Sequence, residues 1–187
     1  MRYLLLFISI FLSSCAYYDS FSQTYEPVDG GFFNEKHIES LQVSLRMHAT
    51  YYHDDPDGFF RKSRVMEPYY LEVRISDRAV PHDMVNFHSM IIENQTHNEV
   101  ITLFTEKDGH LTLPFSERIN LRGDVSWGVE HFWRQKPFAP IFSVNQNLKV
   151  TIEFSIISGD NIRKEKLVFL FKATSDKYKR VLPLIAA

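Results

Sequence analysis

The chain has 187 residues, a formal net charge of −2 and a single cysteine. This length is enough for one domain that buries about 70% of the surface of its unfolded chain. The near-balanced charge excludes broad electrostatic attraction to nucleic acid, so we expect no nucleic-acid partner. One cysteine excludes an internal disulfide, and packing by the sixteen Phe and nine Tyr must therefore stabilise the fold.

The first fourteen residues have the pattern of a secretory signal peptide. Arg2 supplies a positive start, an apolar run follows over residues 3–12, and two serines precede Cys15. A spanning helix needs about twenty apolar residues, and this run is shorter. We therefore predict that residues 1–14 are a cleaved signal peptide rather than a membrane-spanning anchor.

Leu12-Ser13-Ser14-Cys15 resembles the lipobox of bacterial lipoproteins. The resemblance implies cleavage before Cys15, lipidation of its sulfur with palmitate-type chains, and acylation of the new amino group. Two or more acyl chains hold a protein stably on a membrane. Many lipoproteins kept in the inner membrane carry Asp after the cysteine, and Ala16 here favours the periplasmic face of the outer membrane in a Gram-negative cell. In lipobox, length and β content the chain is also similar to the small sandwich lipoprotein of type VI secretion systems.

Residues 15–32 are interpreted as the lipidated cysteine and a tether. Polar residues alternate irregularly with Tyr17, Tyr18, Phe21 and Tyr25, and the stretch shows neither strand alternation nor a helical stripe. Two alternatives stay open: the aromatic rings lie against the domain or in the headgroup layer, or the segment is a disordered spacer. The folded domain is expected at residues 33–187.

Strand patterns begin at Leu41. Apolar and polar residues alternate over residues 41–50, 69–76 and 150–156, which predicts three long half-buried strands. The run Leu167 to Phe171 is continuously apolar and predicts a central strand covered on both faces. Weaker patterns predict further strands at residues 84–93, 100–105, 111–113, 129–134 and 180–184.

The turn residues favour hairpins between these strands. Lys107-Asp108-Gly109-His110 predicts a tight hairpin, and Ser158-Gly159-Asp160-Asn161 predicts another. Seven to nine strands joined in this way indicate an all-β domain. The expected architecture is a single antiparallel two-sheet β-sandwich of immunoglobulin-like or transthyretin-like type, with a barrel as the alternative.

The acidic turn that contains Asp54, Asp55 and Asp57 is a weak candidate for a metal site. Carboxylates on a Gly-containing loop suit a hard cation such as Ca²⁺. However, Pro56 interrupts the cluster, the spacing does not match an EF-hand loop, and these residue types are ordinary in turns. We predict no metal and no cofactor.

Catalytic signatures are missing from the sequence. The histidines form no i,i+4 pair, and Gly-x-Ser-x-Gly does not occur. We predict that the protein is not an enzyme and has no catalytic residues. The alternative is an envelope hydrolase or metal-dependent enzyme on a β-sandwich scaffold. It would require a cleft that gathers two or more residues of the set His48, His53, Asp54, Asp55 and Asp57.

The segment from residue 127 to 140 is rich in aromatic residues and proline. Alternation over residues 127–134 sends Trp127 and Trp133 to one face and Phe132 to the other. Exposed aromatics near Arg are typical of contact surfaces, so a partner surface is predicted at Trp127, Phe132, Trp133 and Phe138. The alternative is that all four are core residues. The expected function is a membrane-anchored binding or adaptor module of the cell envelope, whose partner is an envelope protein or a small ligand.

Overall fold

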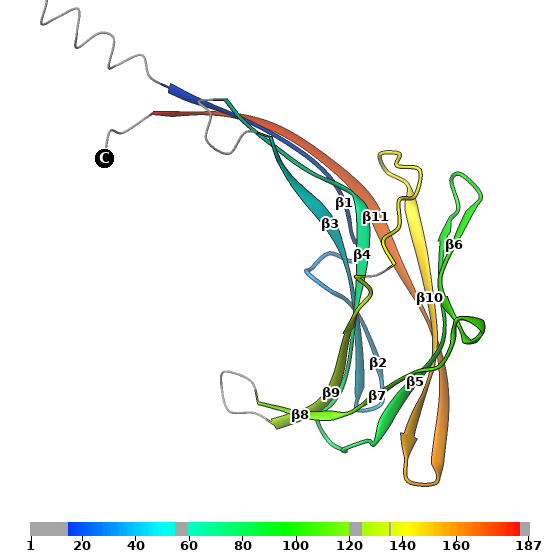
Figure 1. The fold of residues 1–187 in the computed structure, drawn as a ribbon. Coiled ribbons are helices and arrows are strands. Elements are labelled where there is room, and N and C mark those ends of the chain that lie inside the picture. The colour runs from blue at the N-terminus through cyan, green and yellow to red at the C-terminus, as the bar shows by residue number, and fades with distance from the viewer. Residues whose placement is uncertain (1–14, 55–59, 120–124, 135, 184–187) are drawn as a thin grey trace, which may run out of the picture.

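The computed structural model describes residues 15–54, 60–119, 125–134 and 136–183. Across these ranges the regular structure is almost entirely β, which confirms the all-β sandwich (Figure 1). The elements are β1 (Cys15–Pro27), β2 (Asn34–Ile38), β3 (Leu41–Asp54), β4 (Phe60–Asp77), β5 (Met84–Asn94), β6 (Glu99–Thr105), the 3₁₀ turn η1 (Glu106–Asp108), β7 (Leu111–Pro114), β8 (Ser116–Ile119), β9 (Val125–Phe132), β10 (Asn147–Ser158) and β11 (Asn161–Pro183).

Two layers face each other in what we call the sandwich body (Figure 1). One layer has the strand order β2-β3-β4-β9-β8, and the other has the order β11-β10-β5, with β6 and β7 both paired with β5. β1 joins the layers because it pairs antiparallel with β11 and, over residues 17–22, parallel with β4. The described strands thus form one hydrogen-bonded network. It contains one parallel pairing in an otherwise antiparallel arrangement.

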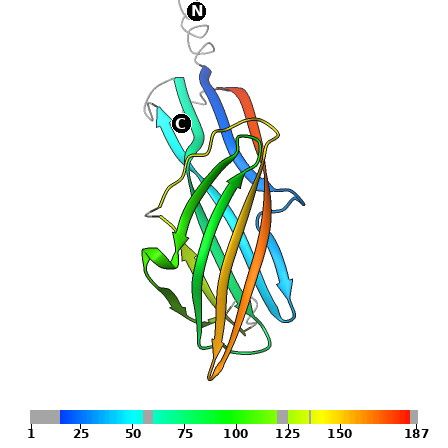
Figure 2. The same cartoon turned by 90° about the vertical axis from the view of Figure 1, so that its right-hand side faces the viewer.

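Four strands continue past the end of the sandwich body as an extension that we call the arm (Figures 1 and 2). The arm consists of residues 15–23 of β1, 50–54 of β3, 60–66 of β4 and 175–183 of β11. Its strand order is β3-β4-β1-β11, and Cys15 pairs with Pro183 at its end.

The expected tether is therefore wrong for residues 15–27, which form β1. Backbone hydrogen bonds to β11 and β4 order this segment. Both partner strands are distant in the sequence, and the segment's own pattern gives no indication of them.

Alternating residues of the long strands fill the core between the layers. Leu45 on β3, Leu71 on β4 and Ile152 on β10 are fully buried, as the alternation predicts. Aromatic residues add much of the volume, and Phe87 and Phe154 are among the largest buried side chains. Full burial of one such side chain contributes about 1.5–3 kcal/mol, so packing can stabilise the domain without a disulfide.

β11 is covered on only one face in the sandwich body. Phe169 and Phe171 are fully buried, whereas Val168 and Leu170 are 38% and 44% exposed. The prediction that residues 167–171 are covered on both faces is wrong. In a two-layer sandwich the outer face of each layer meets solvent, so the apolar side chains on the outer face of β11 are exposed as well.

One of the two expected hairpins is confirmed. Ser158 pairs with Asn161, and Gly159 has φ +56°, which suits the tight connection between β10 and β11. The hairpin expected at residues 107–110 is wrong, because β6 and β7 each pair with β5 and η1 lies between them.

Among the described residues no helix has the length and apolar character needed to cross a membrane.

Candidate functional site

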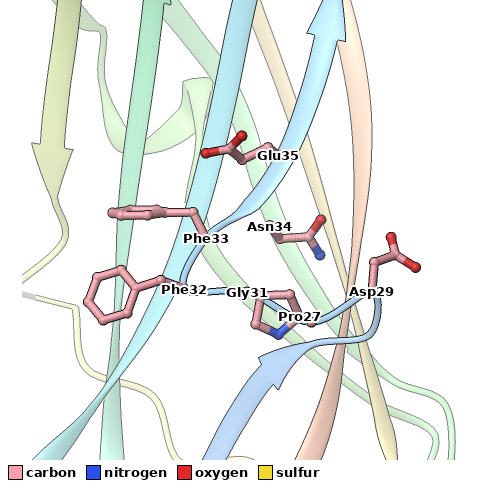
Figure 3. A pocket seen from close by; sticks show the side chains of 8 residues that line it. Pro27, Asp29, Gly31, Phe32, Phe33, Asn34 and Glu35 are labelled. Carbon is pink, nitrogen blue, oxygen red and sulfur yellow. The ribbon is translucent and has the colours of Figure 1, made fainter.

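The loop between β1 and β2 presents two aromatic side chains beside the outer face of β3 and β4. An open hollow of about 440 Å³ is lined by Pro27, the loop residues 29–33, and Asn34 and Glu35 at the start of β2. Phe32 and Phe33 lie on one side of the loop, and Asp29 and Asn34 lie on the other (Figure 3). The Phe32 ring is prominent at the surface, since the residue is 62% exposed.

Two features define the path of this loop, one in its backbone and one in a side chain. Gly30 and Gly31 have φ +81° and +93°, a region in which residues with a Cβ are strained. Asn34, which is buried, donates a hydrogen bond from Nδ2 to the carbonyl oxygen of Leu170 at 2.7 Å. This bond ties the start of β2 to β11 in the opposite layer.

Two arginines from neighbouring strands lie against the two rings. The Arg46 Cζ is 3.2 Å from the centroid of the Phe32 ring, and the Arg74 Cζ is 4.5 Å from that of Phe33. The rings themselves meet edge to face with centroids 5.3 Å apart. Burial lowers the pKa of Arg46, but a guanidinium remains protonated throughout the physiological range. Both contacts are therefore cation–π interactions.

Glu72 contacts both Arg74 and His48. It is 4% exposed and accepts hydrogen bonds from Arg74 Nε at 2.6 Å and His48 Nε2 at 2.5 Å. A second carboxylate, Glu130, lies 3.4 Å from Arg74 Nη2. A buried carboxylate is costly unless it is paired, and this pairing restricts the side chains of Arg74 and His48 to one arrangement.

Phe132 of β9 extends the same surface. Its ring meets the His48 ring edge to face at 4.9 Å and stacks with Tyr70 at 6.1 Å, and the Arg134 Cζ lies 5.0 Å from its centroid. Together these side chains form a surface that we call the aromatic–arginine face, made of Phe32, Phe33, Arg46, His48, Arg74, Phe132 and Arg134. Aromatic and Arg side chains at a surface are typical of protein contacts.

The structure separates the four residues of the expected partner surface. Phe132 belongs to the aromatic–arginine face, and Trp127 is half-buried on β9. Trp133 is 5% exposed and meets Phe87 edge to face at 5.4 Å. Phe138 is 4% exposed and exchanges two backbone hydrogen bonds with Tyr69, so the contact role expected for Trp133 and Phe138 is wrong. Their burial depends on packing against distant strands.

Several predicted site residues cannot be placed. Asp55 and Asp57 lie outside the described residues, as do the side chains of Cys15, His53 and Asp54. Lipidation of Cys15 and the metal candidates therefore stay predictions. Within the described part of the chain, no three His, Cys, Asp or Glu side chains are placed to hold one metal ion.

Folding also brings together a serine, a histidine and an aspartate that sequence reasoning did not connect. Ser158 Oγ lies 2.7 Å from His82 Nδ1, and His82 Nε2 lies 3.0 Å from Asp77 Oδ2. Asp77 is 1% exposed and also accepts bonds from Ser40 and from the backbone of the turn that follows it. Burial by itself raises the pKa of this carboxyl, but the hydrogen bonds together hold it below its ordinary value.

A similar chain joins β5, β10 and η1. Ser155 Oγ lies 2.6 Å from His88 Nε2, and His88 Nδ1 bonds to Glu106. Ser155 is only 2% exposed, so its hydroxyl is shielded from a substrate. In the first chain, the N–H of Gly159 next to Ser158 already bonds Asp83 at 2.6 Å and is not free to bind an oxyanion. Both chains link segments that are distant in the sequence.

No family model matches this chain, and no curated protein is significantly similar to it.

Proposed function

We propose that this protein is a lipid-anchored adaptor of the bacterial cell envelope that binds a protein partner through its aromatic–arginine face. The observation that carries the proposal is the exposed ring of Phe32, packed on Arg46 beside the Phe33 and Arg74 pair. Exposed aromatic and Arg residues dominate the binding energy of many interfaces. Here they are already ordered before a partner arrives, which reduces the entropy lost on binding.

The position of β1 supports the anchoring part of the proposal. Its first residue, Cys15, is the proposed lipidation site, and its last residue, Pro27, leads directly into the loop that carries Phe32. A strand rises about 3.3 Å per residue, so the two ends of β1 are roughly 40 Å apart. An acyl chain and a protein partner can therefore engage opposite ends of this strand at the same time.

The chemistry of the face indicates the kind of partner. Arg46 contacts a phenyl ring, and a guanidinium stacked in this way still presents N–H donors at its edge, whereas Arg74 already donates to Glu72 and Glu130. Carboxylates match these donors in geometry and charge. We expect the partner to present acidic and apolar side chains together.

The contact face is tested by capture of the partner in intact cells. Phe32→Ala should reduce chemical cross-linking to the partner at least tenfold and leave the melting temperature nearly unchanged, because the ring is largely exposed. Ile162→Ala is the matched control, since Ile162 is 65% exposed on β11. Equal capture by wild type and Phe32→Ala would exclude this face as the contact surface.

The lipid anchor needs a separate test. Cells grown with labelled palmitate should label the wild-type protein but not Cys15→Ser, and the wild type should fractionate with membranes. A wild-type protein without label would exclude the lipoprotein assignment and leave the result for Phe32→Ala intact.

A further inference from the structure

A pocket lies between the two layers at the open edge of β3. Its walls come from the last residues of β1, from the loop between β1 and β2, from Arg46 and Met47 of β3, and from Phe171 of β11. Its volume is about 240 Å³. Sites for drug-sized ligands have about 300–1,000 Å³, so this pocket suits a ligand the size of one amino-acid residue. We call it the edge pocket.

The edge pocket exists because β2 covers only part of β3. β2 pairs with residues 41–45 of β3, and no described strand pairs with β3 on that side beyond this range. The chain before β2 turns at Gly30 and Gly31 instead of following the edge of β3. Arg46 and Met47 point to opposite faces of the layer, and the pocket reaches both because it lies at the edge of the strand.

The inner part of the edge pocket is apolar. Tyr25, Met47 and Phe171 line it, and all three are buried members of the hydrophobic core. An apolar side chain that enters from solvent would lose its contact with water against these residues, which favours binding. The pocket therefore selects for an apolar group on the side of the core.

The outer part of the edge pocket carries a positive charge. Arg46 is stacked on the ring of Phe32. Glu72 lies opposite Arg46 in strand register, but its two oxygens bond to the side chains of two other residues, Arg74 and His48. Within the described part of the chain, the Arg46 guanidinium donates no hydrogen bond. Burial lowers the pKa of Arg46 although Glu72 attracts its charge, so the charge is incompletely compensated.

One carboxylate belongs to the described lining of the pocket, and it has a different neighbour. Glu26 is exposed and lies beside Lys172 in the register of β1 and β11. A cross-strand neighbour of opposite charge compensates it. An anion beside Arg46 is therefore favourable, and a carboxylate offers two oxygens that match the N–H groups of a guanidinium.

We infer that the edge pocket receives the C-terminal residue of the protein partner, with its apolar side chain against Met47 and its carboxylate on Arg46. The inference rests on the proposed function, because Phe32 and Arg46 belong to the aromatic–arginine face. It adds which part of the partner enters the molecule and which group each side of the pocket recognises.

A C-terminal residue fits this pocket better than an acidic side chain does. Successive side chains of an extended segment point in opposite directions, so an apolar residue and a neighbouring acidic residue do not enter one small pocket together. A C-terminal residue carries its side chain and its carboxylate on the same Cα, and the two groups diverge from it. That divergence matches Met47 and Arg46 on the two sides of the β3 edge.

Titration with small probes tests the pocket directly. The ¹⁵N-labelled chain of residues 15–187, with Cys15→Ser, is titrated with N-acetyl-phenylalanine, and the amide chemical shifts are followed. We expect saturable shifts centred on Gly31, Phe32 and Met47, with a dissociation constant of about 1 mM, as is usual for so small a ligand. N-acetyl-phenylalaninamide lacks the carboxylate and acetate lacks the ring, and each should bind at least tenfold more weakly.

Matched arginine variants locate the carboxylate. Arg46→Gln should weaken binding of N-acetyl-phenylalanine at least tenfold. Arg46→Lys should recover part of the affinity, because Lys keeps the charge but not the two-donor geometry. Arg78→Gln is the control, since it removes the same charge from an exposed position in the loop after β4. Thermal unfolding of each variant verifies that the fold is retained.

Four results of the titration would overturn the inference. Equal binding of N-acetyl-phenylalanine and its amide, or equal binding by wild type and Arg46→Gln, would exclude a carboxylate site at Arg46. Tighter binding of a blocked dipeptide with an internal glutamate, acetyl-phenylalanyl-glutamyl-amide, would assign the pocket to an acidic side chain. Tighter binding of octanoate would assign it to a fatty acyl chain.

Cross-linking in intact cells separates the inference from the proposed function. Arg46→Gln should reduce partner capture at least tenfold, and Arg78→Gln should leave it unchanged. If Phe32→Ala loses capture but Arg46→Gln retains it, the aromatic–arginine face binds the partner and the inference is wrong. If both variants retain capture, the proposed function is wrong as well, and saturable probe binding would then belong to a carboxylate ligand other than this partner.

Discussion

The sandwich body and the arm use the same strands for different purposes. Tyr25 and Ala173 lie on one face of β1 and β11 and are buried, while Phe21 and Lys177, on that face four residues further along, line an open groove. The difference arises from the neighbouring layer and not from the strands. A strand face becomes core only where a second layer covers it, and past that point the same face is available for binding.

The two regions must also be stabilised differently. In the sandwich body, buried side chains contact both layers and exclude water. In the arm, residues 17–22 of β1 pair with β4 and β11 through backbone hydrogen bonds and cross-strand side-chain contacts. Contacts of that kind contribute about 0.2–1 kcal/mol each, much less than a buried aromatic ring. The arm should therefore open more readily than the body.

The largest expected effect is the difference in lost stability when a Phe is replaced by Ala in the sandwich body and in the arm. Phe154→Ala in the sandwich body should lower the free energy of unfolding by about 3–5 kcal/mol, because the ring is fully buried. Phe21→Ala in the arm should lower it by less than about 1 kcal/mol, because that ring is only half-buried. Urea denaturation of both variants measures the difference. Similar losses would mean that the arm contributes to the core as strongly as the body.

Asp77 provides the next largest effect, at the end of the sandwich body that lies away from the arm. Asp77→Ala should cost about 1–3 kcal/mol, since it removes the buried carboxylate that accepts hydrogen bonds from Ser40, His82 and the following turn. Asp29→Ala, at an exposed loop position, is the control and should be nearly neutral. A neutral Asp77→Ala would show that solvent readily replaces the network.

Low pH should destabilise the protein through protonation of the Asp77 carboxylate. Its pKa is lowered in the folded state, so its contribution to stability is complete above the ordinary Asp pKa near 4 and disappears as the pH falls through the lowered value. Wild type should therefore lose stability below about pH 4 more steeply than Asp77→Asn. Urea denaturation across this range checks the slope, and parallel curves would exclude Asp77 as the titrating group.

Sequence patterns predicted the parts of the fold in which one face is buried throughout a strand. The alternation around Leu45, Leu71 and Ile152 identified β3, much of β4 and β10, since each core position repeats every second residue. The sequence patterns did not predict β1. One face of this strand is exposed in the groove at Phe21 and buried in the core at Tyr25, so no single alternation of burial runs along it. Its parallel partner β4 is also separated from it by a long stretch of sequence, which no local pattern reveals.

The sequence predicted some residues of the candidate site but not their arrangement. Alternation placed Arg46 and Arg74 on polar strand faces, and Phe132 was expected at a contact surface. The aromatic–arginine face, however, depends on strand register and on the loop that carries Phe32. Phe138 was misassigned for the same reason, because its burial results from a backbone bridge to Tyr69.

The smallest expected effect concerns the pairing that joins the two layers. In the arm, Ser63 Oγ donates to Ser20 Oγ at 3.2 Å, and Tyr18 Oη lies 2.8 Å from Ser63 Oγ. Since the Ser63 proton is directed at Ser20, the Tyr18 hydroxyl is the donor in the second bond. Ser63 is 2% exposed, and it therefore links the side chains of β1 and β4 where those strands run parallel.

Ser63→Ala should consequently cost about 0.5–1.5 kcal/mol, and the loss should be local. Amide hydrogen exchange should accelerate in residues 17–22 of β1 and remain unchanged in β10, because opening of the arm leaves the sandwich body closed. Ser44→Ala, a buried serine on β3 in the body, is the matched control and should not accelerate exchange in β1. If Ser63→Ala accelerates exchange equally in β1 and β10, the arm and the body unfold as one unit, and the β1 and β4 pairing is part of the global core.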